Sequence, residues 1–339
     1  MLSPLESLHP AWDETVRLLF RPFSRRRWIA LSVVCLFLGG GTSTAAFQWG
    51  FGAFPVELHP SELLFRVREV IVQHLSLIVL AVAAGLSMVL GLIYVRCVFR
   101  FVLVDAVITK ETVLRAAWGR VSRLGRAYFL WLMGVVGAIV VAVSGILFLS
   151  FRFLYFLREA GYPWWAASIG MVAELVAVVL IGVLVAILIT LTDDLVAPVA
   201  YAERGSLPAA WRTVWRMSRR DHEAFLFYVV LRFALSFGIS IAALFVLFPM
   251  LMGLSSCAFV IAAIVVLALR IVGLAWTWNP VTITLCALAL TVFTGLLFAL
   301  LSVVGMPGQV YLQNYGVRFI ASRVPSLGAL CNPPARGGR

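Results

Sequence analysis

Charged and hydroxyl-bearing side chains stand inside apolar segments of this chain. Glu174 lies near the middle of an apolar run at 165–191. Arg232 lies about two helical turns inside another run at 225–248, four residues before Ser236. Ionisable residues within a membrane are costly, and they often mark a substrate or proton path. These residues therefore support one hypothesis, a small-molecule or lipid transporter with a polar path near Glu174 and Arg232.

A second interpretation makes the same side chains structural. Arg232 can pair with Asp193 or Asp194, at the end of the preceding apolar run, because a long arginine side chain reaches toward the membrane interface. Glu174 shares a helical face with small residues such as Gly170, so it is expected to point into a helix bundle and to be protonated or hydrogen-bonded there. Arg232 lies close enough to the end of its apolar run to reach the interface, which favours the structural interpretation. Both interpretations stay open for Glu174.

The sequence contains no recognisable catalytic or metal-binding motif. His222-Glu223 lacks the second histidine of a zinc-binding HExxH helix. The glycine run at 39–41 lacks the lysine of a phosphate-binding loop, and the five cysteines include no CxxC pair. We therefore expect a protein that is not an enzyme and that has no catalytic residues, no metal and no cofactor.

The composition around these residues is that of a polytopic membrane protein. Of 339 residues, 63% are hydrophobic and only 12% are charged, whereas soluble domains carry about 25% charged residues. The net charge is +12, and all but one of the basic residues are arginines, grouped in blocks between apolar runs. This grouping is typical of topology signals and anionic-lipid contacts. We expect membrane lipids as partners, anionic ones in particular, a partner membrane protein as a second candidate, and no nucleic acid.

Six apolar segments are long enough to cross a bilayer, since about 20 residues are needed for a helical span. These segments are 28–47, 71–95, 128–149, 165–191, 225–248 and 281–304. With six spans, most basic residues fall on the side of the two termini, which predicts that both termini are cytoplasmic. A seventh candidate, from Cys257 to Leu269, is short. We predict that 254–272 is an outer hairpin arm or a re-entrant element, with an ordinary seventh span as the alternative.

One short pattern occurs twice at the edges of these apolar runs. Residues 116–126 and 209–219 both read AAWxxVxR, then Leu or Met, Gly or Ser, and Arg. Residues 11–23 have the character of a third, eroded copy, with apolar residues on one helical face and charged residues on the other. The pattern predicts a repeated unit of one surface helix followed by a hairpin of two spans.

Tryptophan prefers the lipid headgroup level, and arginines spaced by three can reach lipid phosphates. The residues expected at the headgroups are Trp12, Arg17, Trp118, Arg123, Arg126, Trp211, Arg216 and Arg219. Recognition of one particular anionic lipid and general interfacial anchoring both explain them. General anchoring is favoured, because any basic amphipathic helix with a tryptophan meets the same requirement.

The predicted fold is an all-α integral membrane protein with six transmembrane helices in three hairpins, each preceded by an amphipathic interfacial helix. The three units are 1–110, 111–205 and 206–322, and the last contains the outer arm 254–280. A disordered basic tail, 323–339, follows, and all three units belong to one membrane domain.

Several stretches of this layout resemble uncharacterised bacterial polytopic inner-membrane proteins. They are 12–28, Asp105-Ala106-Val107, 194–198, 225–233 and 311–319. The layout is similar to the membrane domain that accompanies some glycerophosphodiester phosphodiesterases and to the YciC family. The resemblance implies a six-helix membrane domain without an assigned activity, and it carries over no functional residue.

These observations together predict a non-catalytic, multi-pass protein of the bacterial inner membrane with both termini in the cytoplasm. Its expected role is to bind lipid or a partner membrane protein in envelope organisation. The alternative is the transporter defined by Glu174 and Arg232.

Overall fold

The computed structural model describes every residue except 1–2, 39–59, 112, 162–163, 272–279 and 332–339, and all regular secondary structure in the described part is helical. Five segments are long and apolar enough to cross a membrane. The long helices are α4 (Pro60–Thr109), α5 (Leu114–Glu159), α6 (Trp164–Leu191), α9 (His222–Ile271) and α10 (Pro280–Ala321).

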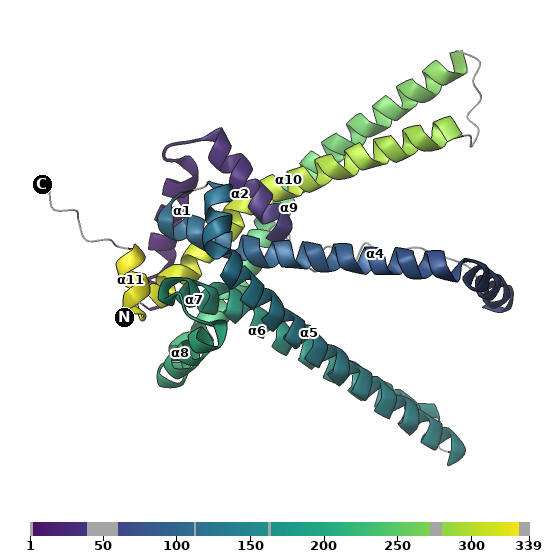
Figure 1. The fold of residues 1–339 in the computed structure, drawn as a ribbon, viewed down its shortest axis with the longest axis horizontal. Helices are drawn as coiled ribbons and strands as arrows, with labels where there is room; N and C mark the ends of the chain where they lie inside the picture. The colour runs from purple at the N-terminus through teal and green to yellow at the C-terminus, as the bar shows by residue number, and fades with distance from the viewer. Residues whose placement is uncertain (1–2, 39–59, 112, 162–163, 272–279, 332–339) are drawn as a thin grey trace, which may run out of the picture.

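The long helices project as three arms from one end of the molecule (Figure 1). Helices α5 and α6 lie side by side in one arm, α9 and α10 lie side by side in a second, and α4 projects as a third. The most apolar stretches of these helices are exposed almost throughout their length. Apolar surface of this extent needs apolar surroundings, which fits a membrane protein.

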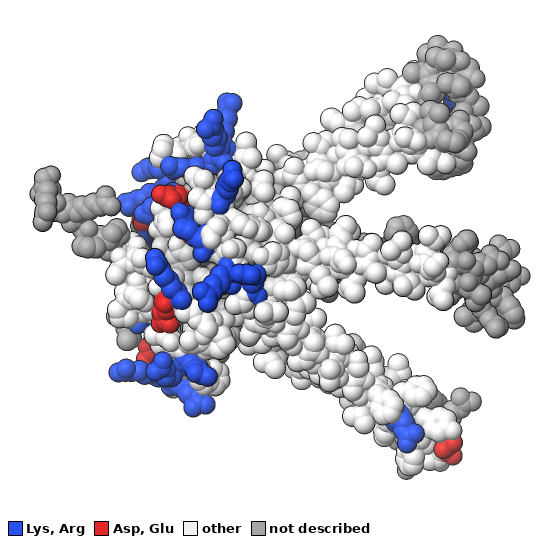
Figure 2. Space-filling model, in the orientation of Figure 1, with Lys and Arg blue, Asp and Glu red and all other residues white. Residues whose placement is uncertain are grey.

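The inner ends of the long helices meet the short helices in a packed region that we call the hub. The short elements of the hub are α1 (Leu8–Phe20), α2 (Arg25–Leu38), the π-helical turn η1 (Thr192–Val196), α7 (Ala197–Glu203), α8 (Leu207–Arg220) and α11 (Pro325–Cys331). Most of the buried side chains lie here. The Tyr228 ring stacks on Phe319 and Tyr315, with ring centroids 4.5 and 5.1 Å apart. Figure 2 shows that lysine and arginine side chains gather on the hub, whereas the described lengths of the arms show few charged side chains, near the outer end of one arm.

A glycine allows α5 to approach α4 closely at the hub. A Cβ atom on Gly125 would lie 2.6 Å from Cγ2 and 2.9 Å from Cα of Val98. Because no Cβ is present, the two backbones can pack at this distance. The second residue pair that fixes α4 is ionic: Arg120 of α5 donates to Asp105, with Nη2 and Oδ2 2.7 Å apart.

Polar contacts tie the N-terminal helix α1 to the hub. Glu14 accepts from Lys110 at 3.0 Å and from Arg318 at 2.7 Å. Burial alone would raise the pKa of Glu14, but Lys110 and Arg318, together with Arg17, lower it below its usual value. Close by in α10, the Asn314 side-chain amide donates to the Thr15 hydroxyl oxygen at 3.0 Å.

The first predicted span, 28–47, is only partly described. Helix α2 covers its beginning and ends at Leu38, and the rest lies outside the described residues. The described half buries Leu31, Val34 and Cys35 and contacts α10 and α4. Five candidate spans, not six, are therefore seen in the described part of the chain.

Two elements that the sequence predicts as separate are continuous with neighbouring helices in the structure. Residues 254–271 form the outer part of α9, which runs without a break from the hub to the end of its arm. The first copy of the repeated pattern, 116–126, forms the first turns of α5 and is not a separate surface helix. The second copy does form a separate helix, α8, because the backbone leaves the helical region at Asp221 (φ −126°, ψ 51°). No comparable stop follows Arg126.

Candidate functional site

A buried carboxylate marks the point where the arms converge. The Asp194 side chain is 1% exposed and lies in η1, at the inner end of α6. Arg100 of α4 reaches its Oδ1 at 2.8 Å, and Arg232 of α9 reaches its Oδ2 at 2.5 Å. One carboxylate therefore joins helices from all three arms.

The neighbouring carboxylate, Asp193, faces the same space. It accepts a hydrogen bond from the Tyr128 hydroxyl at 2.6 Å, and Nε of Arg100 lies 3.6 Å away. Successive side chains of a regular α-helix point about 100° apart. In the wider turn of η1 both carboxylates line one cavity. Single π-helical turns within α-helices occur frequently at functional sites.

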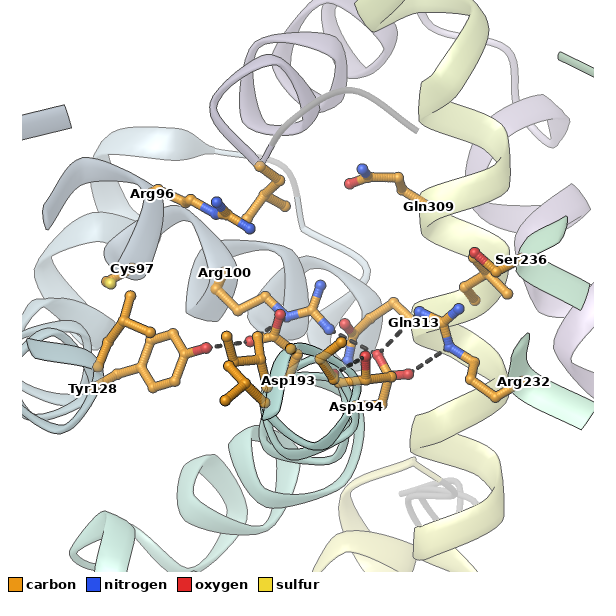
Figure 3. A pocket seen from close by; sticks show the side chains of 18 residues that line it. Arg96, Cys97, Arg100, Tyr128, Asp193, Asp194, Arg232, Ser236, Gln309 and Gln313 are labelled. Carbon is orange, nitrogen blue, oxygen red and sulfur yellow. Dashed lines mark hydrogen bonds and ion pairs between the residues drawn. The ribbon is translucent and has the colours of Figure 1, made fainter. Parts of the chain in front are cut away.

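These residues line a cavity of about 460 Å³ at the inner ends of the arms (Figure 3). The volume lies within the usual range for small-molecule sites, about 300–1,000 Å³. The side chains that line it are those of Leu38, Arg96, Cys97, Arg100, Tyr128, Leu132, Gly182, Val185, Ala186, Ile189, Thr190, Asp193, Asp194, Arg232, Ser236, Gln309, Leu312 and Gln313.

The lining residues form two levels, because four helices each contribute a pair spaced by four residues. Arg100, Tyr128, Arg232 and Gln313 lie on the hub side with the two aspartates, and we call this level the floor. One helical turn farther toward the arms, at the level that we call the rim, lie Arg96, Leu132, Ser236 and Gln309. In Figure 3, Arg96 and Gln309 extend into the open space from opposite sides.

The charged side chains of the floor compensate one another, whereas the charge at the rim is not compensated. Arg100 and Arg232 are both held by Asp194. Arg96 has no carboxylate partner in the described part of the chain. Three arginines and two aspartates line the cavity, which gives it a net charge of +1. The cavity is therefore suited to a molecule with one negative charge.

Two glutamines add unused hydrogen-bonding capacity. Gln313 is 1% exposed, and neither its amide nitrogen nor its amide oxygen has a hydrogen-bond partner within the described structure. The Gln309 amide oxygen is also buried and unpartnered there. Leaving a buried polar atom without a partner costs about 1–3 kcal/mol, so native proteins rarely do so without a reason. A ligand in the cavity would supply the missing partners.

The structure brings four of the sequence-predicted intramembrane residues together. Asp193, Asp194, Arg232 and Ser236 all line the cavity. Glu174 does not join them, because it precedes Asp194 by 20 residues on the same helical segment, which is about 30 Å along the axis. It lines a shallow apolar hollow together with neighbouring side chains of α6.

The residues predicted at the headgroups fall into two groups. The arginines are exposed on the hub surface: Arg17, Arg123, Arg126, Arg216 and Arg219. The tryptophans instead contact other rings of the protein. Trp12 packs edge-on to Tyr311, Trp118 packs edge-on to Tyr94 and Phe99, and Trp211 stacks with Trp131. Trp12 still keeps 58% of its surface exposed.

Sequence reasoning missed Arg96, Arg100, Gln309 and Gln313. A signal for them exists, since each pair is spaced by four residues at the inner end of an apolar run. The spacing places each pair on one helical face, but only the packing of α4 against α10 shows that the two faces meet. Among the described residues, no group of three or more His, Cys, Asp or Glu side chains could hold a metal ion.

The fold and the site define a class: an all-helical protein with candidate membrane-spanning helices and a polar cavity at the inner ends of its arms. The chain belongs to a family of unknown function, DUF7544, which matches residues 2–330. No curated protein and no solved structure matches it. The similarity to the phosphodiesterase-associated membrane domain and to the YciC family therefore stays a prediction.

Proposed function

We propose that this chain is a non-catalytic protein of the bacterial inner membrane that binds lipid through the cavity between its hub and its arms. The observation that carries the proposal is the cavity itself. It combines a charged floor with the apolar side chains of Leu132, Val185 and Ile189 nearer the arms. A lipid has the same two parts, a polar headgroup and apolar chains.

The position of the cavity supports the same proposal. It lies where the charged hub meets the exposed apolar arms, which is the level expected for lipid headgroups. The exposed arginines of the hub surface, Arg123, Arg126, Arg216 and Arg219, would face the phosphates of the surrounding leaflet.

We propose six spans in three hairpins with both termini in the cytoplasm. In this arrangement the first span begins in α2, and the hub lies at the cytoplasmic interface. The concentration of basic residues on the hub supports this orientation, because cytoplasmic loops carry an excess of Lys and Arg.

The proposed topology can be tested with single cysteines in a cysteine-free background. We expect Arg339→Cys and Arg216→Cys to be protected from an impermeant thiol reagent in intact cells, and Glu159→Cys at the end of α5 to react. Opposite labelling of Arg339→Cys and Arg216→Cys would require an odd number of spans between them and would contradict the proposal.

Lipid binding can be tested by native mass spectrometry of the full chain, extracted gently from its own membrane. We expect one stoichiometric lipid that survives extensive washing, because a ligand held between several helices exchanges more slowly than lipid on the exposed surface does. A matched pair of variants locates it: Ser236→Leu fills the cavity and should remove the lipid, whereas Ser255→Leu, on the outer part of α9, should not. A chain that retains a second protein and no stoichiometric lipid would replace lipid binding with a scaffold role.

The transporter alternative would need a polar path from Glu174 to Arg232. The side chains of α6 between Glu174 and the cavity are apolar up to Thr190, which gives this alternative little support. The similarity to the phosphodiesterase-associated membrane domain is compatible with either role.

A further inference from the structure

We propose that the cavity recognises a phosphodiester headgroup that carries one negative charge and a hydroxyl donor, with Arg96 as the group that binds the phosphate. This inference rests on the proposed lipid-binding function and names the chemistry of its ligand. It distinguishes Arg96, Gln309 and Gln313, which bind the ligand, from the charged residues of the floor, which hold the helices together.

The charge follows from the pairing of the arginines. Asp194 bonds to both Arg100 and Arg232, and Asp193 lies beside Arg100, so the guanidinium groups of the floor are already compensated. Arg96 contributes the one positive charge that remains. A phosphodiester has one negative charge, and an arginine fork matches the geometry of its two free oxygens. A dianionic phosphomonoester would leave one negative charge uncompensated.

The need for a donor follows from Gln313. Its amide has a donor nitrogen and an acceptor oxygen, and both are buried without a partner in the described structure. Because both ends are unpartnered, the conclusion does not depend on which way the amide is oriented. A phosphate oxygen can accept from the nitrogen, whereas a hydroxyl of the ligand can donate to the oxygen. Gln309, at the rim, adds a second unpartnered amide oxygen.

The shape of the cavity places the two parts of such a ligand. Arg96 of α4 and Gln309 of α10 extend into the cavity from opposite sides, and Gln313 lines it one helical turn below Gln309 (Figure 3). Leu132, from α5, lies toward the arms at the level of the rim. A headgroup bound between the first three residues would direct its chains outward, along the exposed apolar arms.

The test uses the full chain, purified in detergent and stripped of lipid, with binding followed by native mass spectrometry and by the shift in melting temperature. The probes are phosphatidylglycerol, phosphatidic acid and diacylglycerol, and glycerophosphoglycerol as a headgroup without chains. We expect phosphatidylglycerol to bind more tightly than phosphatidic acid, and diacylglycerol not to bind. Equal binding of diacylglycerol would overturn the phosphate assignment while leaving lipid binding intact.

Glycerophosphoglycerol separates the two sources of the same headgroup. Weak binding of this probe beside tight binding of phosphatidylglycerol shows that the ligand is a lipid. Equal affinities would assign the cavity to a free phosphodiester and would overturn the lipid-binding function while supporting the headgroup chemistry. Failure of both probes to bind would overturn both proposals.

Two variants test whether Arg96 binds the phosphate. Arg96→Ala should weaken phosphatidylglycerol binding about tenfold to a hundredfold, because it removes a charge-assisted hydrogen bond. Arg220→Ala removes an exposed arginine outside the cavity and should leave the affinity unchanged. Equal losses in the two variants would show that surface charge, and not the cavity, attracts the lipid.

Gln313→Met provides a variant whose effect cannot be mistaken for unfolding. Methionine has a similar size and no unpartnered polar atoms, so the lipid-free variant should melt at a higher temperature than the wild-type protein. Its melting temperature should rise less on addition of phosphatidylglycerol, because the bonds to the headgroup are lost. A variant with raised stability and an undiminished lipid-induced shift would exclude Gln313 from the site.

Discussion

Asp194→Asn is expected to destabilise the hub by about 3–5 kcal/mol, the cost of removing one partner from a buried ion pair. The substitution keeps the size of the side chain and removes its charge. Arg100 and Arg232, whose side chains are 12% and 14% exposed, would then be left without the carboxylate that compensates both of them. Thermal unfolding of the purified protein in detergent, followed by tryptophan fluorescence, measures the loss.

Asp193→Asn is the matched control, because it makes the same chemical change at the adjacent residue. The Asp193 side chain is 20% exposed, and its main partner is the neutral hydroxyl of Tyr128, which can also donate to an amide oxygen. The expected loss is about 1 kcal/mol. Equal losses at the two positions would contradict the central role of Asp194, and so would a neutral effect of Asp194→Asn.

The contrast between these aspartates shows what the sequence could predict. The positions of the long helices follow from apolar runs of about 20 residues or more, and the structure contains helices over all five fully described runs. The pairing of Arg232 with Asp193 or Asp194 also follows from sequence, because both carboxylates and the arginine occur at the same end of neighbouring runs. The choice of Asp194 depends on the direction of each side chain in η1, which periodicity does not give.

The sequence could not predict the cavity, and the reason is different. Arg96 and Gln309 belong to α4 and α10, which lie far apart in the chain, and each residue alone is an ordinary polar residue at the end of an apolar run. Hydropathy describes how a helix meets its surroundings, not which faces of two helices meet. Glu174 shows the converse case, since its intramembrane position suggested a site but placed it far from the other charged residues along α6.

The repeated pattern was informative about surfaces and less so about helix boundaries. Its arginines at 123, 126, 216 and 219 are exposed on the hub. Its tryptophans, Trp118 and Trp211, pack against rings of the protein, because inner ends of the long helices bring Tyr94 and Trp131 beside them. A position at the membrane interface and a packing contact within the protein both favour a large, amphipathic ring, so the sequence does not distinguish them.

The second large effect is expected from Gly316→Leu, which tests how closely α10 approaches the carboxylate centre. A Cβ atom on Gly316 would lie 2.8 Å from the carbonyl oxygen of Asp194 and 3.1 Å from the Tyr228 hydroxyl. The nearest atom belongs to the backbone, so it cannot move aside as the end of a flexible side chain would. We expect a loss of about 3 kcal/mol from overpacking, measured by the same thermal unfolding.

Gly295→Leu makes the same substitution in the same helix, at a position on the arm where a Cβ would meet nothing within 4 Å. Leucine is the better helix former, so this control should be neutral or stabilising. If Gly316 acts by holding η1 in place, Gly316→Leu already displaces Asp194 from Arg100 and Arg232. The double variant with Asp194→Asn should then lose less than the two single losses added together. Full additivity would show that the glycine and the ion pairs stabilise the hub independently, and that η1 does not need α10 to position its carboxylates.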